Sequence, residues 1–584
     1  MIDAHPPIGF RRLRAIVAAL TVDPARPSIA VPGRIASMTA RWPIGIRDGL
    51  GCLSLVALFL TIEPFIEKAS HHSDEVYQSV SPTWAAVAQS STTASVVVVA
   101  IVTAWCWRRV RWRELGPNAD AMRGIVLAAA VCVGWSALFA PFNYWHGSWM
   151  SVERTALAGC IAAAVFRPGM IPPTVVAVYG LAGQYHTPLQ HSWTDREMVF
   201  HVLIWAWAFL LCRPFGWPVV VARHFVIVLC GAMAAWFVLP AIGKWQLGWA
   251  AEEQVHHLTA AARYQNGWLG WLAPETFDRT IGLLRRMNAP MVWSTLILET
   301  AAIGLLLSRR FTVGLLLGCI GLHVGIYVSS GVFFWKWMVV EAAVATAVWR
   351  WRAEGDRPVT GRAAWPLAAG VCGLMLVGCD DLVRLAWYDE PIAYRFRMTA
   401  TDREGRRYQV PASAMTPYDF PFAQARFHFT THRPPLCDCF GCNGSPDIHH
   451  RLDAASNHPA TERRRRHRSA IEDFGDDRFD PVRRRRFETL LDRYLRHRRT
   501  GTPGWFDHVT AWVGCPNHIG SGPRPDDGLP VIDTSVRPVA LEVSLEEAWV
   551  DGSKSWPLYR EGALVTAGDS ASATVAEVAE GLRH

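Results

Sequence analysis

The chain has 584 residues, of which 51% are hydrophobic and 28 are tryptophan, and its mean hydropathy is +0.13. These values exclude an ordinary soluble protein and are typical of a multi-pass membrane protein with a soluble part. The formal net charge of +8 would suit nucleic-acid binding, but the arginines lie mostly beside apolar runs or in one late segment. Membrane topology explains that distribution better, so we expect no nucleic-acid partner.

Residues 1–43 contain arginine and proline and lack the compact order of a cleaved signal peptide, so we interpret them as a cytoplasmic leader. Between residues 44 and 387, apolar runs of membrane-spanning length alternate with polar connections. We therefore expect a mainly α fold, a multi-pass transmembrane helical bundle. About eleven spans are expected, at 46–66, 86–107, 123–142, 153–167, 171–184, 197–213, 217–240, 290–308, 312–332, 334–351 and 364–386.

The distribution of arginine predicts the orientation of this bundle. If residue 1 is inside, the inside loops carry most of the arginines, whereas the outside loops carry histidine, acidic and aromatic residues. An odd number of spans then places the C-terminal part of the chain outside. We expect a cell-membrane protein with a cytoplasmic N-terminus, an extracytoplasmic C-terminal domain and spans in contact with lipid.

One predicted outside connection, at 241–289, is much longer than the usual connection between helices. Its segment 249–272 has apolar residues at helical spacing and three tryptophans, which is typical of helices that lie along a membrane interface. We therefore expect interfacial helices within 241–289.

Ionisable residues lie in or at the ends of the later spans, at Lys244, Glu299, His323, Lys336 and Glu341. Charged groups at membrane depth are costly, so each one suggests a function. Lys244 is either a catalytic base in a desolvated site or a lysine that extends its amine to the interface. His323 is either catalytic or held by a structural hydrogen bond. The two glutamates are either proton-relay groups or members of ion pairs with Lys336 or Arg286.

Two short elements and the order of the spans resemble a known family. The segment LPAIGKWQLGW (239–249) ends one span and leads into the amphipathic segment, and QHSW (190–193) precedes another. A span with Glu299 and a span with His323 follow, and the latter leads into Phe333 and Phe334. This arrangement, over about residues 120–350, resembles the horizontally transferred transmembrane (HTTM) domain, a family that includes vitamin K-dependent gamma-carboxylase.

The resemblance implies acid–base chemistry at the outer membrane face. In the carboxylase, a desolvated lysine deprotonates a reduced vitamin K hydroquinone, and Lys244 lies at the matching position. His191 matches the histidine of the second element. A reduced quinone is thus the cofactor that the resemblance suggests. Burial disfavours an ammonium ion, which makes a buried amine a usable base. The family also places a β-rich extracellular domain after its bundle.

The composition changes at residue 388, and we expect a soluble mixed α/β domain over 388–562. The alternation in 394–411 predicts a β-hairpin with its turn near 402–405, and 536–552 predicts another strand. The latter half of 461–501 has apolar residues at helical spacing, at Phe487, Leu490, Leu491, Tyr494 and Leu495. The arginine run before it is expected to be a solvated loop or a headgroup-binding segment. We expect a loose tail at 563–584.

Four cysteines of this domain have two possible uses: Cys437, Cys439, Cys442 and Cys515. Thiolates, with nearby histidines, could hold zinc tetrahedrally. In an oxidising compartment, two disulfides are the simpler use of four thiols, so we expect disulfides and no metal site.

Two functional hypotheses follow. The first is a membrane enzyme in which Lys244 and His191, with His323 and Glu299, act on a lipid-soluble cofactor or substrate. The second is a non-catalytic membrane anchor or immunity-type subunit, whose extracytoplasmic domain binds a protein or peptide partner. Replacement of Lys244 by methionine distinguishes the two.

Overall fold

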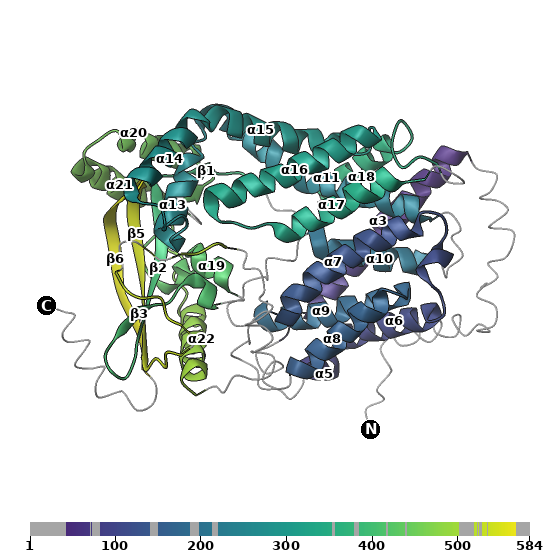
Figure 1. The fold of residues 1–584 in the computed structure, drawn as a ribbon, viewed down its shortest axis with the longest axis horizontal. Helices are drawn as coiled ribbons and strands as arrows, with labels where there is room; N and C mark the ends of the chain where they lie inside the picture. The colour runs from purple at the N-terminus through teal and green to yellow at the C-terminus, as the bar shows by residue number, and fades with distance from the viewer. Residues whose placement is uncertain are drawn as a thin grey trace, which may run out of the picture.

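A computed structural model describes most of the chain from residue 43 to residue 567. The described ranges are 43–70, 72, 82–139, 150–186, 198–212, 220–352, 357–378, 385–415, 418–437, 441–500, 519–522, 524, 528–533 and 535–567. Figure 1 shows a helical bundle on one side and a β-sheet with its own helices on the other. The helices α13 (His256–Asn266) and α14 (Pro274–Arg286) lie where the two parts meet.

Four helices of the described part are long and apolar enough to cross a membrane. They are α3 (Ile44–Ser70), α7 (Ala119–Phe139), α11 (Ala222–Gln246) and α16 (Arg309–Ser330). The remaining bundle helices are shorter: α5 (Pro82–Gln89), α6 (Ser91–Trp107), α8 (Met150–Ala164), α9 (Ile171–His186), α10 (Met198–Cys212), α15 (Asn288–Ala301), α17 (Trp335–Arg350) and α18 (Trp365–Gly378). Short 3-10 turns occur at Trp112–Leu115, Pro168–Met170, Ala302–Gly304, Ala412–Met415 and His428–Thr430.

The expected count of about eleven spans is therefore not supported by helix length and composition. Local breaks that periodicity does not reveal shorten the apolar runs. The run at 86–107 is divided at Ser90, whose hydroxyl accepts a hydrogen bond from the Thr93 N–H at 3.3 Å and caps α6. The run at 290–308 stops being α-helical at Ala301, and Leu306 has a positive φ of 72°.

The helix α11 forms the centre of the bundle, because almost all of its side chains are buried. The helix α18 packs along it with close contact at Gly231. A Cβ atom at Gly231 would lie 2.6 Å from the backbone oxygen of Ala368, so only glycine permits this approach. In the first turn of α11, the guanidinium of Arg223 donates to Asp48 of α3 at 2.7 Å.

The connection at 241–289 is helical, as expected, and contains α12 (Trp249–Glu252), α13 (His256–Asn266) and α14 (Pro274–Arg286). However, α13 is buried between the bundle and the sheet. The Gln265 amide donates to the Tyr394 carbonyl at 2.6 Å, and Trp268, just after α13, donates to the Val328 carbonyl of α16 at 3.1 Å. The segment that we expected to lie along a membrane interface thus contacts the C-terminal domain.

The C-terminal domain contains a four-stranded antiparallel sheet of order β3-β2-β5-β6. Its strands are β2 (Ile392–Thr401), β3 (Arg407–Gln409), β5 (Ala540–Asp551) and β6 (Lys554–Ala567), and a separate pair joins β1 (Tyr388–Asp389) to β4 (Cys442–Asn443). The predicted hairpin is confirmed, because β2 pairs with β3 through a turn in which the Gly405 N–H donates to the Asp402 carbonyl. The strand predicted at 536–552 is confirmed as β5.

The helices of this domain are α19 (Asp419–Ala423), α20 (Pro446–Ser456), α21 (Ala460–Phe474) and α22 (Pro481–Thr500). All five apolar side chains predicted for α22 are buried. Two expectations were wrong in part. The first arginine run lies in α21, where Glu462 pairs with Arg465 and Arg466 at helical spacing. The strand β6 continues beyond residue 562, because its pairing with β5 extends to Ala567, and the rest of the expected tail, 568–584, lies outside the described residues.

Candidate functional site

The amine of Lys244 lies inside the protein. Lys244 is in the last turn of α11, and its Nζ donates to Glu299 Oε1 of α15 at 2.5 Å. The side chains of Lys244 and Glu299 are only 10% and 9% exposed, and the ring centroid of Trp249 lies 5.0 Å from Nζ. A lysine that extends to the interface would expose its amine, so the structure contradicts that alternative.

The backbone explains why these groups meet. Side chains of an α-helix point toward its N-terminus, so Lys244 lies back along α11 and beside α15. Glycine at 243 allows the segment after α18 to pass close by, because an added Cβ would lie 2.6 Å from the Cβ of Ala386. This approach brings β1 and its acidic residues to the same end of α11.

His323 and Glu341 form a second buried pair in the bundle. His323 Nδ1 lies 3.4 Å from Glu341 Oε2, and the rings of Phe237, Phe334 and Trp337 surround the imidazole. Glu341 therefore pairs with His323 rather than with Lys336, and Glu299 pairs with Lys244 rather than with Arg286. Phe237, which contacts the His323 ring, lies on α11 about two turns before Lys244, so His323 is in the same part of the bundle as the Lys244–Glu299 pair. Three of the four predicted catalytic residues thus lie in one region.

The other predicted site residues are placed only in part. His191, Cys439 and Cys515 lie outside the described residues. Cys437 and Cys442 are buried in the C-terminal domain. No disulfide joins two cysteines of the described ranges, and these ranges contain no group of three or more side chains suited to a metal ion. The disulfides and the zinc alternative stay predictions.

Sequence reasoning missed a pair of buried carboxyl groups close to Lys244. Glu253 follows α12, and both of its carboxylate oxygens accept from the Asp389 N–H, at 3.3 and 3.2 Å. The Trp387 indole donates to Asp389 Oδ1 at 3.1 Å. Both carboxyl groups are almost fully buried. The only signal in the sequence was the adjacency of acidic residues, in Glu252-Glu253 and Asp389-Glu390.

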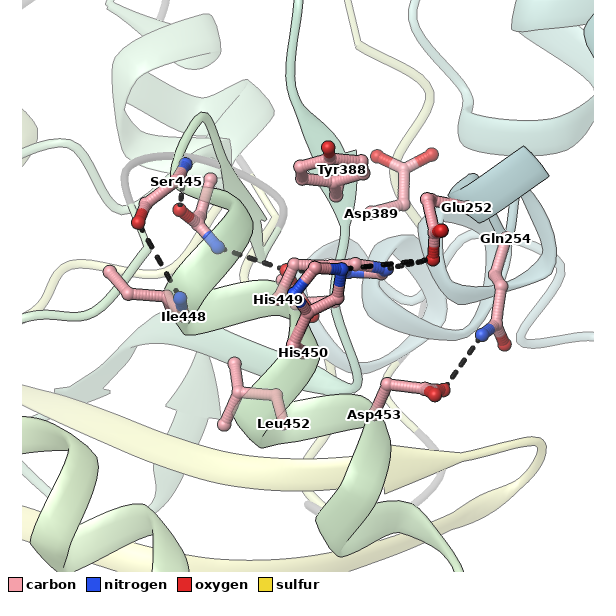
Figure 2. A network of polar contacts seen from close by, with 12 residues as sticks. Glu252, Gln254, Tyr388, Asp389, Ser445, Ile448, His449, His450, Leu452 and Asp453 are labelled. Atoms are coloured by element: carbon pink, nitrogen blue, oxygen red, sulfur yellow. Dashed lines mark hydrogen bonds and ion pairs between the residues drawn. The ribbon is translucent and has the colours of Figure 1, made fainter. Parts of the chain in front are cut away.

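A second missed group is centred on His449 of α20 (Figure 2). Its Nδ1 lies 3.2 Å from Glu390 Oε1, which also accepts from the Asn443 amide at 2.9 Å. Its Nε2 faces Glu252 Oε2 at 4.0 Å, and the ring of Tyr388 stacks on the imidazole with a centroid separation of 4.1 Å. His449 therefore lies between a buried carboxyl group, Glu390, and a half-exposed one, Glu252.

The burial of these groups changes their affinity for protons. Burial raises the pKa of Glu253, Asp389 and Glu390, because an ionised carboxylate is poorly solvated there. Burial lowers the pKa of His449, but the hydrogen bond and charge of Glu390 outweigh this effect and raise it overall. The cluster is therefore able to retain protons that exposed carboxylates would lose at neutral pH.

Replacement of Asp389 by asparagine is expected to weaken the pH dependence of stability. Burial raises the pKa of Asp389 to about 7, whereas an unfolded aspartate has a pKa of about 3.9. Between these values the folded protein retains a proton that the unfolded chain releases, so the free energy of unfolding falls as the pH rises. One proton limits this slope to about 1.4 kcal/mol per pH unit.

The measurement is denaturant unfolding of the purified protein in detergent micelles from about pH 4 to about pH 8. The variant with Asp389→Asn should lose less stability across this interval than the unmodified protein. An equal loss in both proteins would contradict a proton on Asp389.

Comparison of the chain with protein-family models, curated proteins and solved structures found no match. The resemblance to the HTTM domain therefore stays a prediction, and the chemistry of the site is argued from its own residues. These residues supply a buried amine, buried carboxyl groups and a histidine, which together can accept, hold and donate protons. Such groups are the usual components of general acid–base catalysis.

Proposed function

We propose that this protein is a membrane enzyme that carries out proton transfer on a lipid-soluble substrate beside Lys244. The buried Lys244–Glu299 pair carries this proposal. Removing both charges from water is costly, and replacing such a pair with apolar residues often leaves a protein equally or more stable. A function in proton transfer accounts for the presence of this costly pair.

The pair holds one proton that can lie on either partner. Lys244 acts as a base only when its proton is on Glu299 or has left the pair, since an ammonium ion cannot accept a proton. His323 and Glu341 lie within the same buried region and would stabilise charge that develops there. A lysine and a glutamate that share a proton are therefore the working groups of the proposed site.

The surface beside the pair suits an apolar ligand. Trp245 and Trp293 contact each other at 5.8 Å between ring centroids, and both are exposed, as is Ile297 of α15. In a membrane these side chains would face lipid at the level of Lys244. A reduced quinone fits this setting, because its hydroxyl groups supply an acidic proton and its ring is apolar. Lys244 and Glu299 would hold that proton.

We further propose the orientation that the arginine distribution predicts, with a cytoplasmic N-terminus and an extracytoplasmic C-terminal domain in the cell membrane. In that orientation Lys244 lies at the outer end of α11. The expected disulfides would then form in an oxidising compartment.

The test replaces both charges at once. A variant with Lys244→Met and Glu299→Met leaves no unpaired buried charge, so it should reach normal abundance in the membrane. We expect loss of the cellular phenotype that deletion of the chain also causes. A Thr295→Val variant on the same helix as Glu299, whose hydroxyl donates to the Met291 carbonyl, is the matched control and should retain the phenotype. An active double variant would contradict an enzymatic role for the pair.

The anchor hypothesis has its own support. Polar contacts join the 241–289 connection to the C-terminal domain, since Arg285 pairs with Asp551 at 2.7 Å and Gln254 donates to Asp453 at 2.8 Å. These contacts hold the domain in a fixed position above the bundle, as a partner-binding subunit requires. An unaffected phenotype in the double variant would favour this alternative.

A further inference from the structure

The proposed site needs a route by which a proton can leave. Lys244 can act repeatedly as a base only if the proton that it accepts is passed on to water. The pair is buried, and the C-terminal domain covers this end of α11. The groups that could carry a proton outward are therefore those of the domain interface.

The domain interface carries carboxyl groups and one histidine between Lys244 and the aqueous surface. The Trp249 ring, whose centroid lies 5.0 Å from Lys244 Nζ, donates through its indole to the Trp387 carbonyl, and the Trp387 indole donates to Asp389. The backbone N–H of Asp389 donates to Glu253. Glu390 follows Asp389 in the chain and lies 3.2 Å from His449. Oxygen Oε2 of Glu390 is buried and has no hydrogen-bond partner among the described residues, so it can take a proton.

His449 is suited to pass a proton from a buried carboxyl group to a solvent-accessible one. Its Nδ1 faces the buried Glu390, and its Nε2 faces Glu252, whose side chain is 46% exposed. The ring is fixed by stacking on Tyr388 (Figure 2). The separation of 4.0 Å between His449 Nε2 and Glu252 Oε2 is longer than a hydrogen bond. Rotation of the half-exposed Glu252 side chain can close this gap.

We propose that Glu253, Asp389, Glu390, His449 and Glu252 form a proton relay between the Lys244 site and water. This proposal rests on the proposed function, because it supplies the exit for the proton of that site. The Glu253–Asp389 pair stores one proton. Glu390 gives a proton to His449 Nδ1 while Nε2 releases one to Glu252, so the number of protons on the imidazole is unchanged. Glu252 then passes the proton to water.

The other charged groups around the relay are few in the described part of the chain. His450 of α20 lies 3.9 Å from Glu252, and Asp453 of the same helix is bonded to Gln254. His257 of α13 is buried near His449, and burial lowers the pKa of its imidazole. His257 is thus held neutral near physiological pH and does not oppose a proton on His449.

The experiment measures hydrogen–deuterium exchange of the stored proton by infrared spectroscopy. The purified full-length protein in detergent micelles should show the C=O stretch of protonated carboxyl groups, and Asp389→Asn should weaken this band because the pair that stores the proton loses one member. After dilution into D2O the band shifts as the proton exchanges. With His449→Phe, which keeps a ring against Tyr388, exchange should slow by about tenfold or more.

A second variant and a control keep this test independent of folding. Glu252→Gln changes a half-exposed side chain and should slow exchange in the same way. His432→Gln changes an exposed histidine of the same domain that pairs with Asp477 instead, and it should leave the rate unchanged. Equal rates in all four proteins, or a carboxyl band that Asp389→Asn does not change, would overturn the relay. Neither result depends on the activity of Lys244, so the relay can fail while the proposed function stands.

Discussion

Replacement of Lys244 alone by methionine is expected to lower the free energy of unfolding by about 3–5 kcal/mol. The loss arises because Glu299 would remain buried without its partner. The second carboxylate oxygen of Glu299, Oε2, has no hydrogen-bond partner among the described residues. The Lys244 ammonium is therefore the group that the structure shows stabilising the buried negative charge of Glu299. Denaturant unfolding of the purified protein in micelles, followed by tryptophan fluorescence, would measure this loss.

The control for this prediction is the double variant with Lys244→Met and Glu299→Met. It should recover most of the stability, because neither charge remains in the buried site. If the single and double variants were equally unstable, the loss would come from packing around methionine rather than from the unpaired carboxylate. If neither variant lost stability, Glu299 would be reached by water and the site would not be desolvated.

Replacement of Phe487 by alanine is expected to cost about 3–5 kcal/mol. Phe487 is fully buried at the centre of an aromatic cluster in the C-terminal domain. Its ring contacts those of Phe396, Phe422, Phe427 and Phe429, with centroid separations of 5.9, 5.6, 5.1 and 6.3 Å. Truncation would leave a cavity between β2 and α22, because the surrounding rings cannot all move to fill it.

The matched control for Phe487→Ala is Val482→Ala, on the same helix. Val482 is 51% exposed, so its truncation should change stability by less than about 0.5 kcal/mol. Limited proteolysis of the domain in the full-length protein would follow both variants. Equal resistance of the Phe487 variant and the unmodified protein would show that α22 does not support the sheet.

The sequence by itself determined the features that depend on local pattern. Alternation and the turn at Asp402 to Gly405 identified the hairpin, and the spacing of Phe487, Leu490 and Leu491 identified the buried face of α22. Composition identified a membrane-type bundle, although local breaks such as the Ser90 cap made the spans fewer than predicted. These features follow from short-range periodicity, which a single sequence records directly.

Only the tertiary structure decided which groups form the site. Glu299 is 55 positions from Lys244, and Asp389 is 136 positions from Glu253, so no local pattern connects these partners. Periodicity shows that a face is apolar or polar, but not which element covers it. The carboxyl groups of Glu253 and Asp389 are buried because a distant domain folds over the end of α11. Desolvation, which gives these groups their altered affinity for protons, is therefore a property of the assembled fold.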